Sequence, residues 1–434
     1  MKKLLSLAFI FIFTLAIPFS AHAYKPTFKT HAKAGILYNV DTDTVVYSDN
    51  IDKKIYPASL TKIMVAVLLV EAEEDLEDLT LTVSEEIYLE YRYSEAVIAG
   101  FESGDKVNGH DLLAYTMVKS CADASAVIAE HVAGGEENFV KMMNEKAKEI
   151  GMTNTHFTNC HGLHDPDHYS TVRDLCILTK YAMKYSLITD VVKVARYITK
   201  DDITLAATNF LIDPNSGYHY SYATGFKTGY TTEAGRCLAS TATYEGMTYI
   251  SILVGCPPQD NSVENRYEFI DTAELFRWAF TNFTYRSVLE NSETIDSIPI
   301  DYSWDYDTVN IRPEKEVFAL IPTEADQSTI EIKTEYSLKR AEAPVQKGDV
   351  VGVVDVYYAD EKIGSTAAVI AESVEGSQML KVFAAVEGFF QKYKTVFFLC
   401  FFALFVVLVV FIAITVRLNS KKKRYGSVKR YRRF

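Results

Sequence analysis

The sequence predicts an α+β domain, followed by a small all-β domain and one membrane-spanning helix. Three observations support this. Residues 24–285 mix helical and strand patterns, and residues 286–378 hold short β-like runs separated by turn residues. Residues 395–416 carry no charged side chain over 22 positions. Mixed periodicities indicate an α+β core, and 22 uncharged residues are long enough to cross a bilayer as a helix.

The N-terminal segment, residues 1–23, has the features of a secretory signal peptide. Lys2 and Lys3 precede a long apolar stretch, and Ala21-His22-Ala23 matches a small-x-small cleavage site. The alternative is a segment that is retained as a membrane anchor. Because a cleavage site follows the apolar stretch, we expect removal of the segment and export of the body of the chain.

The C-terminal region predicts attachment to the membrane. Residues 379–394 have an apolar face and basic ends, as in a segment that lies at the membrane surface. Residues 417–434 contain nine basic residues and no acidic one, so the positive-inside rule places this tail in the cytoplasm. A basic tail could also bind nucleic acid, but its position directly after a span favours anionic lipid headgroups.

Charge and cysteine content restrict the function of the exported body. The chain has a net charge of −13, but the body, residues 24–394, has 33 basic against 57 acidic residues. A body near −24 argues against nucleic-acid binding. An odd number of cysteines outside the span, with no CxxC pair, does not match a disulfide framework or a zinc ribbon. We interpret these five cysteines as small buried residues, and one disulfide among them is the alternative. They are Cys121, Cys160, Cys176, Cys237 and Cys256.

The elements of the first domain follow from local patterns of apolar, turn and breaker residues. We expect two strands around an Asp-Thr-Asp turn, a buried helix, two helices with a break near Ser120, an amphipathic helix with a glycine stop, two strands across a Glu-Gly turn, and a last helix. In chain order these are residues 34–50, 60–74, 111–134, 136–152, 237–256 and 271–280. The all-β region contains no His and no Cys, and it is predicted to be a spacer or docking module.

Three short segments carry the chemistry. Ser59 and Lys62 stand at the start of the buried helix, where positions i and i+3 share a face. A partly desolvated lysine loses its proton easily and can then take one from a serine hydroxyl; a serine at a helix start can also be only a cap. Ser120 follows at the helix break, and Lys227-Thr228-Gly229 opens a predicted strand. Each segment alone is common, but SxxK, a serine loop and KTG in this order form a known set.

With these motifs, the chain resembles the low-molecular-mass penicillin-binding proteins, which are serine-type D-alanyl-D-alanine carboxypeptidases. The resemblance covers nearly the whole exported body. It includes "YPASLTKIM", "GHDLLAYTMVKSCADASAVIAEHVAG", "GMTNTHFTNCHGLHDPDHYST", "GFKTGYTTEAGRCLASTA" and "VQKGDVVGVVDVYYADEKIGS". It implies a serine β-lactamase/DD-peptidase-like transpeptidase domain, with an antiparallel sheet, helices on its faces, and the site between the sheet and a helical lobe.

The resemblance also implies an activity. The enzyme would remove the terminal D-alanine from peptidoglycan stem peptides, without a metal or an organic cofactor, and β-lactams would inhibit it covalently. Ser59 would be the nucleophile, Lys62 the base that takes its proton, and Ser120 the relay to the leaving D-alanine.

Binding roles are implied for the third motif. Lys227 and Thr228 would hold the terminal carboxylate of the substrate. Gly229, without a side chain, would let the substrate backbone pair alongside the strand. The backbone N–H groups of Ser59 and of a residue near Thr231 would form the oxyanion hole.

The second motif departs from the family. The family has Ser-x-Asn, whereas this chain has Ser120-Cys121-Ala122. The methyl group of Ala122 cannot make the hydrogen bonds of an asparagine amide. Loss of one hydrogen bond to a charged or strained partner costs roughly 1.5–3 kcal/mol, or about 10- to 150-fold in rate. Asp123 or a water could replace the amide, the enzyme could be slow or act on another D-amino-acid peptide, or it could be acylated by β-lactams with little turnover. The alternative function is therefore a catalytically weak membrane protein that binds penicillin or cell-wall peptides.

Other candidate sites are weaker. Cys121 could act as a nucleophile, although no histidine stands near it in the sequence to activate it. A cluster of histidines and aspartates in residues 156–168 could hold zinc, but its spacing is not HExxH, and Pro166 interrupts any helix. We interpret this cluster as a polar loop beside the cleft. Arg266 is a further candidate for binding carboxylate.

Overall fold

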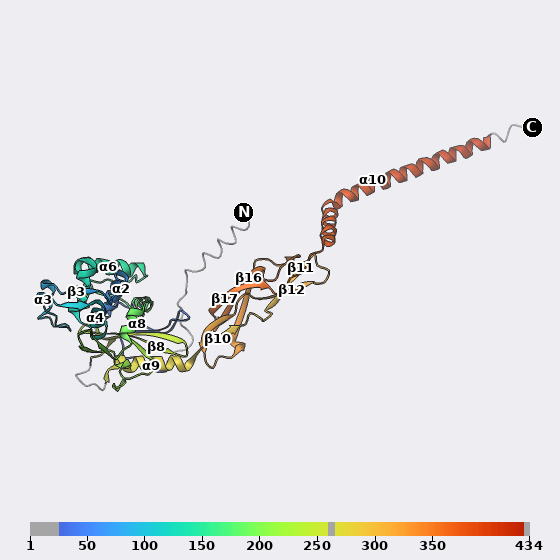
Figure 1. The fold of residues 1–434 in the computed structure, drawn as a ribbon. Helices are drawn as coiled ribbons and strands as arrows, with labels where there is room; N and C mark the ends of the chain where they lie inside the picture. Colours follow the sequence, from blue (N-terminus) through green and yellow to red (C-terminus); the bar gives the residue numbers. More distant parts are fainter. Residues whose placement is uncertain (1–25, 259–264, 429–434) are drawn as a thin grey trace, which may run out of the picture. The chain divides into compact units, whose positions relative to one another are not determined.

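A computed structural model describes residues 26–258 and 265–428, with side chains up to residue 420. The predicted signal peptide lies outside the described residues. The chain divides into two compact units (Figure 1). The first takes the chain up to Val288 with Phe318–Glu331 and Tyr357–Ile363, and the second takes Leu289–Val317, Ile332–Val356 and the chain from Gly364 onward.

The first unit is built on an antiparallel sheet of five strands, in the order β2-β1-β9-β8-β7. The predicted N-terminal hairpin forms, and so does the hairpin across Glu245 and Gly246, both of which have positive φ. The chain returns to place β9 beside β1, so β7 remains an edge strand. The bounds are β1 Ala34–Asn39, β2 Thr44–Asp49, β7 Ala223–Thr231, β8 Gly235–Tyr244 and β9 Met247–Cys256.

The position of the KTG motif in β7 differs from the prediction. The strand begins four residues earlier, at Ala223, so Lys227 lies in its middle and not at its start. The sequence before the motif, Ala-Thr-Gly-Phe, has a glycine that hides the strand pattern. Pairing of Lys227 with Ala239 and Gly229 with Cys237 holds the motif in register against β8.

The two faces of the sheet bury different cores. Ile36 and Tyr38 of β1 pack in the larger cluster with the helical lobe and α7 (Val172–Ala182). Leu37, between them, points to the other face, which α9 (Tyr267–Asn282) covers. Figure 1 shows α9 running beside β8. This alternation is the period-2 pattern of a strand between two layers.

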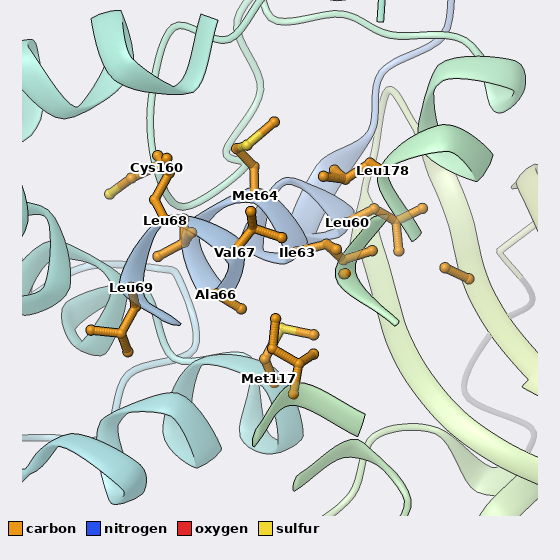
Figure 2. Packing of buried hydrophobic residues seen from close by; sticks show 14 of the residues in the cluster. Leu60, Ile63, Met64, Ala66, Val67, Leu68, Leu69, Met117, Cys160 and Leu178 are labelled. Atoms are coloured by element: carbon orange, nitrogen blue, oxygen red, sulfur yellow. The ribbon is translucent and has the colours of Figure 1, made fainter. Parts of the chain in front are cut away.

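The helical lobe surrounds α2 (Lys62–Ala72), whose residues from Lys62 to Val70 are all buried. Side chains leave α2 in every direction and meet Met117, Cys160 and Leu178 from separate elements (Figure 2). A helix that is apolar all round is stable only inside a core. The lobe also contains η1 Ala58–Thr61, α3 Glu85–Tyr91, α4 Gly109–Ala114, η2 Tyr115–Lys119, α5 Ala122–Ala133, α6 Glu136–Glu149 and α8 Ser186–Val192, with the antiparallel strand pairs β3 Thr80–Thr82/β4 Lys106–Asn108 and β5 Arg196–Ile198/β6 Thr204–Ala206. The turn η3 Phe210–Ile212 packs with α9 on the other face of the sheet.

Strands dominate the chain after α9, as the sequence predicts. The predicted domain boundary at residue 285 falls inside β10 (Phe283–Leu289), which pairs with β13 (Val317–Pro322). A six-stranded sheet has the order β14-β16-β17-β12-β11-β15. Its bounds are β11 Asp296–Asp301, β12 Thr308–Pro313, β14 Ile330–Tyr336, β15 Ala341–Glu342, β16 Val350–Tyr358 and β17 Glu361–Ile370.

The chain ends in a long helix, α10 (Gln378–Val428), drawn in red in Figure 1. Within the described residues, it is the one helix that is long and apolar enough to cross a membrane, over Gln378–Ser420, with a mean hydropathy of 3.3 in its most apolar window. Its apolar side chains are exposed, as expected for a helix whose partner is lipid.

Candidate active site

Ser59 stands on a short 3₁₀ turn directly before α2. The α-helix begins at Lys62, later than the sequence suggests, and no side chain caps either the turn or the helix. The interpretation of Ser59 as a helix cap is therefore wrong. Ala58, the residue before it, has φ +48°, a conformation that residues with a Cβ rarely adopt. Such strain at a single residue is typical of functional sites.

Lys62 lies within hydrogen-bond distance of the serine hydroxyl. Its Nζ lies 3.2 Å from Ser59 Oγ and 2.5 Å from the carbonyl oxygen of His161. The side chain is buried, and burial lowers the pKa of the Lys62 ammonium to about 8. A substantial fraction of the amine is therefore neutral near physiological pH, placed to accept the serine proton.

Ser120 ends a π-helical turn and has φ +72°, which breaks the helix as the sequence predicts. The next residues join a neighbouring segment. The backbone N–H of Ala122 donates to the carbonyl of Val97, and the Asp123 carboxylate accepts from the N–H groups of Ala99 and Gly100. Both oxygens of Asp123 are thus engaged with this segment, which argues against Asp123 as the replacement for the missing amide.

The KTG motif faces the site from the exposed edge of β7. Lys227 is fully buried, and burial, followed by the charge of Lys62, holds its pKa well below the usual value. Thr228 donates to the hydroxyl of Thr208, which donates to the carbonyl of Val118, two residues before Ser120. A Cβ on Gly229 would lie 3.0 Å from the backbone nitrogen of Ser59, so any side chain here would press against the Ser59 turn.

The three motifs are therefore brought together. Gly229 lies against the Ser59 turn, and the charges of Lys62 and Lys227 both act on the thiol of Cys121, beside Ser120. Burial nevertheless raises the pKa of Cys121 to about 12. The thiol is buried and protonated, which argues against Cys121 as the nucleophile. Thr231 ends β7, and its hydroxyl accepts from the N–H of Ala234.

Two contributors to the site were not predicted from the sequence. The carbonyl of His161 binds Lys62, and a backbone acceptor has no sequence signature. Thr208 bridges two of the motifs, but an isolated threonine in a loop carries no pattern. The polar loop of residues 156–168 does flank the lysine, as the sequence suggests.

The guanidinium of Arg266 already has partners within the protein, which argues against the prediction that it binds a substrate carboxylate. Its Nε lies 2.5 Å from a carboxylate oxygen of the buried Glu268, and its guanidinium lies over the rings of Phe210 and Phe269. These contacts fix the start of α9.

Comparison with known proteins places this geometry in a family. Residues 20–257 match the model of the D-alanyl-D-alanine carboxypeptidase family, and residues 283–376 match that of the penicillin-binding protein 5 C-terminal domain. The D-alanyl-D-alanine carboxypeptidase DacF of Bacillus subtilis is 28% identical over 411 residues, covering 91% of this chain and 100% of that protein. DacC of Escherichia coli, also a D-alanyl-D-alanine carboxypeptidase, is 30% identical, covering 85% and 90%.

Solved structures agree with this result. Penicillin-binding protein 5 from Haemophilus influenzae is 26% identical, with a TM-score of 0.63 over 81% of this chain and 100% of that one. Penicillin-binding protein D2 from Listeria monocytogenes, solved in its cefotaxime-bound form, is 27% identical, with a TM-score of 0.52 over 59% and 100%. With its serine, lysine and KTG strand assembled in one site, this chain belongs to the D-alanyl-D-alanine carboxypeptidase family.

Proposed function

We propose that the protein removes the C-terminal D-alanine from peptidoglycan stem peptides through an acyl-enzyme on Ser59. The observation that carries the proposal is the pair formed by Ser59 Oγ and the buried Lys62 Nζ, 3.2 Å apart. A neutral lysine at this distance can accept the hydroxyl proton as the oxygen attacks. The relatives with this family's name support the choice of substrate.

The reaction runs in two steps. Ser59 Oγ attacks the carbonyl carbon of the penultimate residue and passes its proton to Lys62. The C–N bond to the terminal D-alanine then breaks, and the amine leaves with a proton relayed through Ser120. Water hydrolyses the resulting ester and restores the hydroxyl of Ser59. The N–H of Ser59 and an N–H near Thr231 stabilise the oxyanion of each step.

Substrate binding uses the edge of β7. The unpaired backbone of an edge strand can pair with an extended peptide, and Gly229 keeps this approach open. The Thr228 hydroxyl holds the terminal carboxylate by a hydrogen bond, and the negative charge of that carboxylate favours the ammonium form of Lys227 beside it. Because Thr228 donates to Thr208 in the free protein, its hydroxyl must turn toward the ligand on binding.

The same proposal places the catalytic domain outside the cytoplasmic membrane. The apolar part of α10 spans the bilayer, residues 379–394 lie at its outer surface, and the basic tail stays inside. Anchoring keeps the site close to newly made wall peptides. The alternative, a catalytically weak protein that binds β-lactams or wall peptides, is favoured by one observation, the methyl group of Ala122 in place of an amide.

Labelling with a fluorescent penicillin tests the nucleophile. We expect a covalent adduct on the detergent-solubilised full-length chain that is lost in Ser59→Ala, because no other hydroxyl among the described residues is hydrogen-bonded to a buried lysine. Ser125→Ala is the matched control: this serine is buried in the same lobe and bonds only to the carbonyl of Cys121, so labelling should persist. An adduct that survives in Ser59→Ala would overturn the assignment.

The pH dependence of acylation tests the base. Below the pKa of Lys62, about 8, the ammonium has no lone pair, so the acylation rate should rise with pH and level off above about 8. Lys227→Arg replaces the second buried lysine by a group that stays charged at every pH of the measurement, and the rise should remain. A rate that is constant from pH 6 to pH 9, or a rise that disappears in Lys227→Arg, contradicts the role of Lys62.

Restoring the amide tests the departure from the family. Ala122→Asn should raise the rate of D-alanine release from diacetyl-Lys-D-Ala-D-Ala by up to about 150-fold, since one hydrogen bond to a charged or strained partner is regained. Ala122→Leu adds similar bulk without an amide and should give no gain. If Ala122→Asn leaves the rate unchanged, the amide is already replaced in the native site.

The turn before Ser59 depends on the glycine packed against it. A Cβ on Gly162 would lie 2.1 Å from the carbonyl oxygen of Ala58, so Gly162→Ala should displace the nucleophile and reduce penicillin acylation by at least roughly 10-fold. Gly134→Ala is the control, because Gly134 also has positive φ but no atom within 4 Å of the added carbon. It should lower stability alone. Equal acylation by both variants would show that the turn tolerates displacement.

A further inference from the structure

A buried histidine is connected to the nucleophile turn through a threonine. His168 is 2% exposed, and its Nε2 lies 2.8 Å from the hydroxyl of Thr61. The same hydroxyl lies 2.8 Å from the carbonyl oxygen of Ala58, to which it donates. On the other side of the ring, Nδ1 lies 3.1 Å from the backbone nitrogen of Thr158.

The partners of His168 determine which atom donates in each of these hydrogen bonds. The backbone N–H of Thr158 can only donate, so Nδ1 must accept and carries no proton. The proton of the neutral ring is then on Nε2, which donates to Thr61, and the threonine proton is left for the Ala58 carbonyl. Burial, followed by the charge of His161, lowers the pKa of His168 to about 4, which keeps the ring neutral at physiological pH.

The last acceptor in this series of hydrogen bonds, the Ala58 carbonyl, belongs to the peptide bond that joins Ala58 to Ser59. The carbonyl of Ala58 and the N–H of Ser59 are opposite ends of one planar trans amide, so fixing the oxygen fixes the direction of the N–H. Ala58 has φ +48°, a strained conformation for a residue with a Cβ. An amide in this conformation needs contacts that hold it.

We propose that His168 and Thr61 are positioning residues that orient the Ala58–Ser59 peptide, so that the Ser59 N–H points into the oxyanion hole. The proposal rests on the proposed function, with Ser59 as the acylated residue. A threonine that bonds back to a carbonyl three residues earlier is common at helix starts. Here the histidine leaves that hydroxyl no other direction, and the carbonyl belongs to the amide that precedes the nucleophile.

The Ser59 N–H donates to the oxyanion of the transition state, so its misorientation should lower the acylation rate. Loss of one oxyanion donor costs about 10²–10³ in rate, and a donor that is only misdirected should cost less. Thr61→Val and His168→Leu should therefore reduce the first-order rate of acylation by benzylpenicillin roughly 10- to 100-fold. The dissociation constant of the preceding noncovalent complex should stay the same.

Conservative variants and a matched control separate positioning from stability. Thr61→Ser keeps the hydroxyl and should restore the acylation rate. Thr179→Val removes another fully buried threonine that bonds back along its own helix, to the carbonyl of Leu175. It should lower the melting temperature to a similar degree without changing acylation. The double variant Thr61→Val/His168→Leu should be no slower than Thr61→Val alone, since both residues act through one hydroxyl.

The infrared spectrum of the acyl-enzyme gives a direct readout. With benzylpenicillin labelled by ¹³C at the reacting carbonyl, the ester stretch of Thr61→Val should move to higher frequency than in the wild type and in Thr179→Val, because its hydrogen bond is weaker. Wild-type rate and frequency in Thr61→Val would overturn the positioning role while leaving Ser59 as nucleophile. A wild-type chain without any Ser59 adduct would overturn the proposed function itself.

Discussion

The contact on which the site depends is the burial of Lys62 at the first residue of α2. An ammonium in the protein interior is strongly destabilised, and it either finds an ion partner or loses its proton. Here its direct partners are a hydroxyl and a carbonyl, those of Ser59 and His161, and neither carries a charge. The same burial that lowers the pKa therefore makes the side chain a base.

The surroundings of α2 make this burial possible. The helix is covered on all sides (Figure 2), so Lys62 cannot turn toward solvent without unpacking the core. Lys227, from the edge strand, is buried nearby and raises the cost of a second charge. Two buried lysines lower the stability of the fold, and the extensive apolar packing around them offsets that loss. The buried lysines thus lower the stability of the fold at the site where a reactive amine is needed.

The sequence predicts the elements of this fold well, because they depend on local patterns. A short local pattern is enough to predict the all-apolar helix, the helix break at Ser120 and the Glu-Gly hairpin. The KTG strand was misplaced at its start because Gly225 interrupts its pattern. Ser59 was open to interpretation as a cap, because the sequence does not distinguish a 3₁₀ turn from the first turn of an α-helix.

The contacts that complete the site could not be predicted in the same way. They join residues far apart in the chain through backbone atoms or single hydroxyl groups, such as the His161 carbonyl and Thr208. Asp123 shows the reverse case. Its place beside Ala122 suggests a substitute for the missing amide, but its carboxylate holds the segment at Ala99 and Gly100. Only the three-dimensional structure decides between these uses of the same side chain.

The arrangement also explains how a chain can lose the family's asparagine and keep its fold. Ala122 is buried, and its backbone N–H still bonds to Val97, so the loop that carries Ser120 does not depend on the side chain at this position. Lys62 is held from another direction, by His161. The amide of the asparagine is thus not needed for the structure of the site, and in the function that we propose it would act on the bound substrate. In the function that we propose, the chemistry at Ser59 and the binding of the peptide are therefore separable, since the first depends on the core around α2 and the second on the edge of β7.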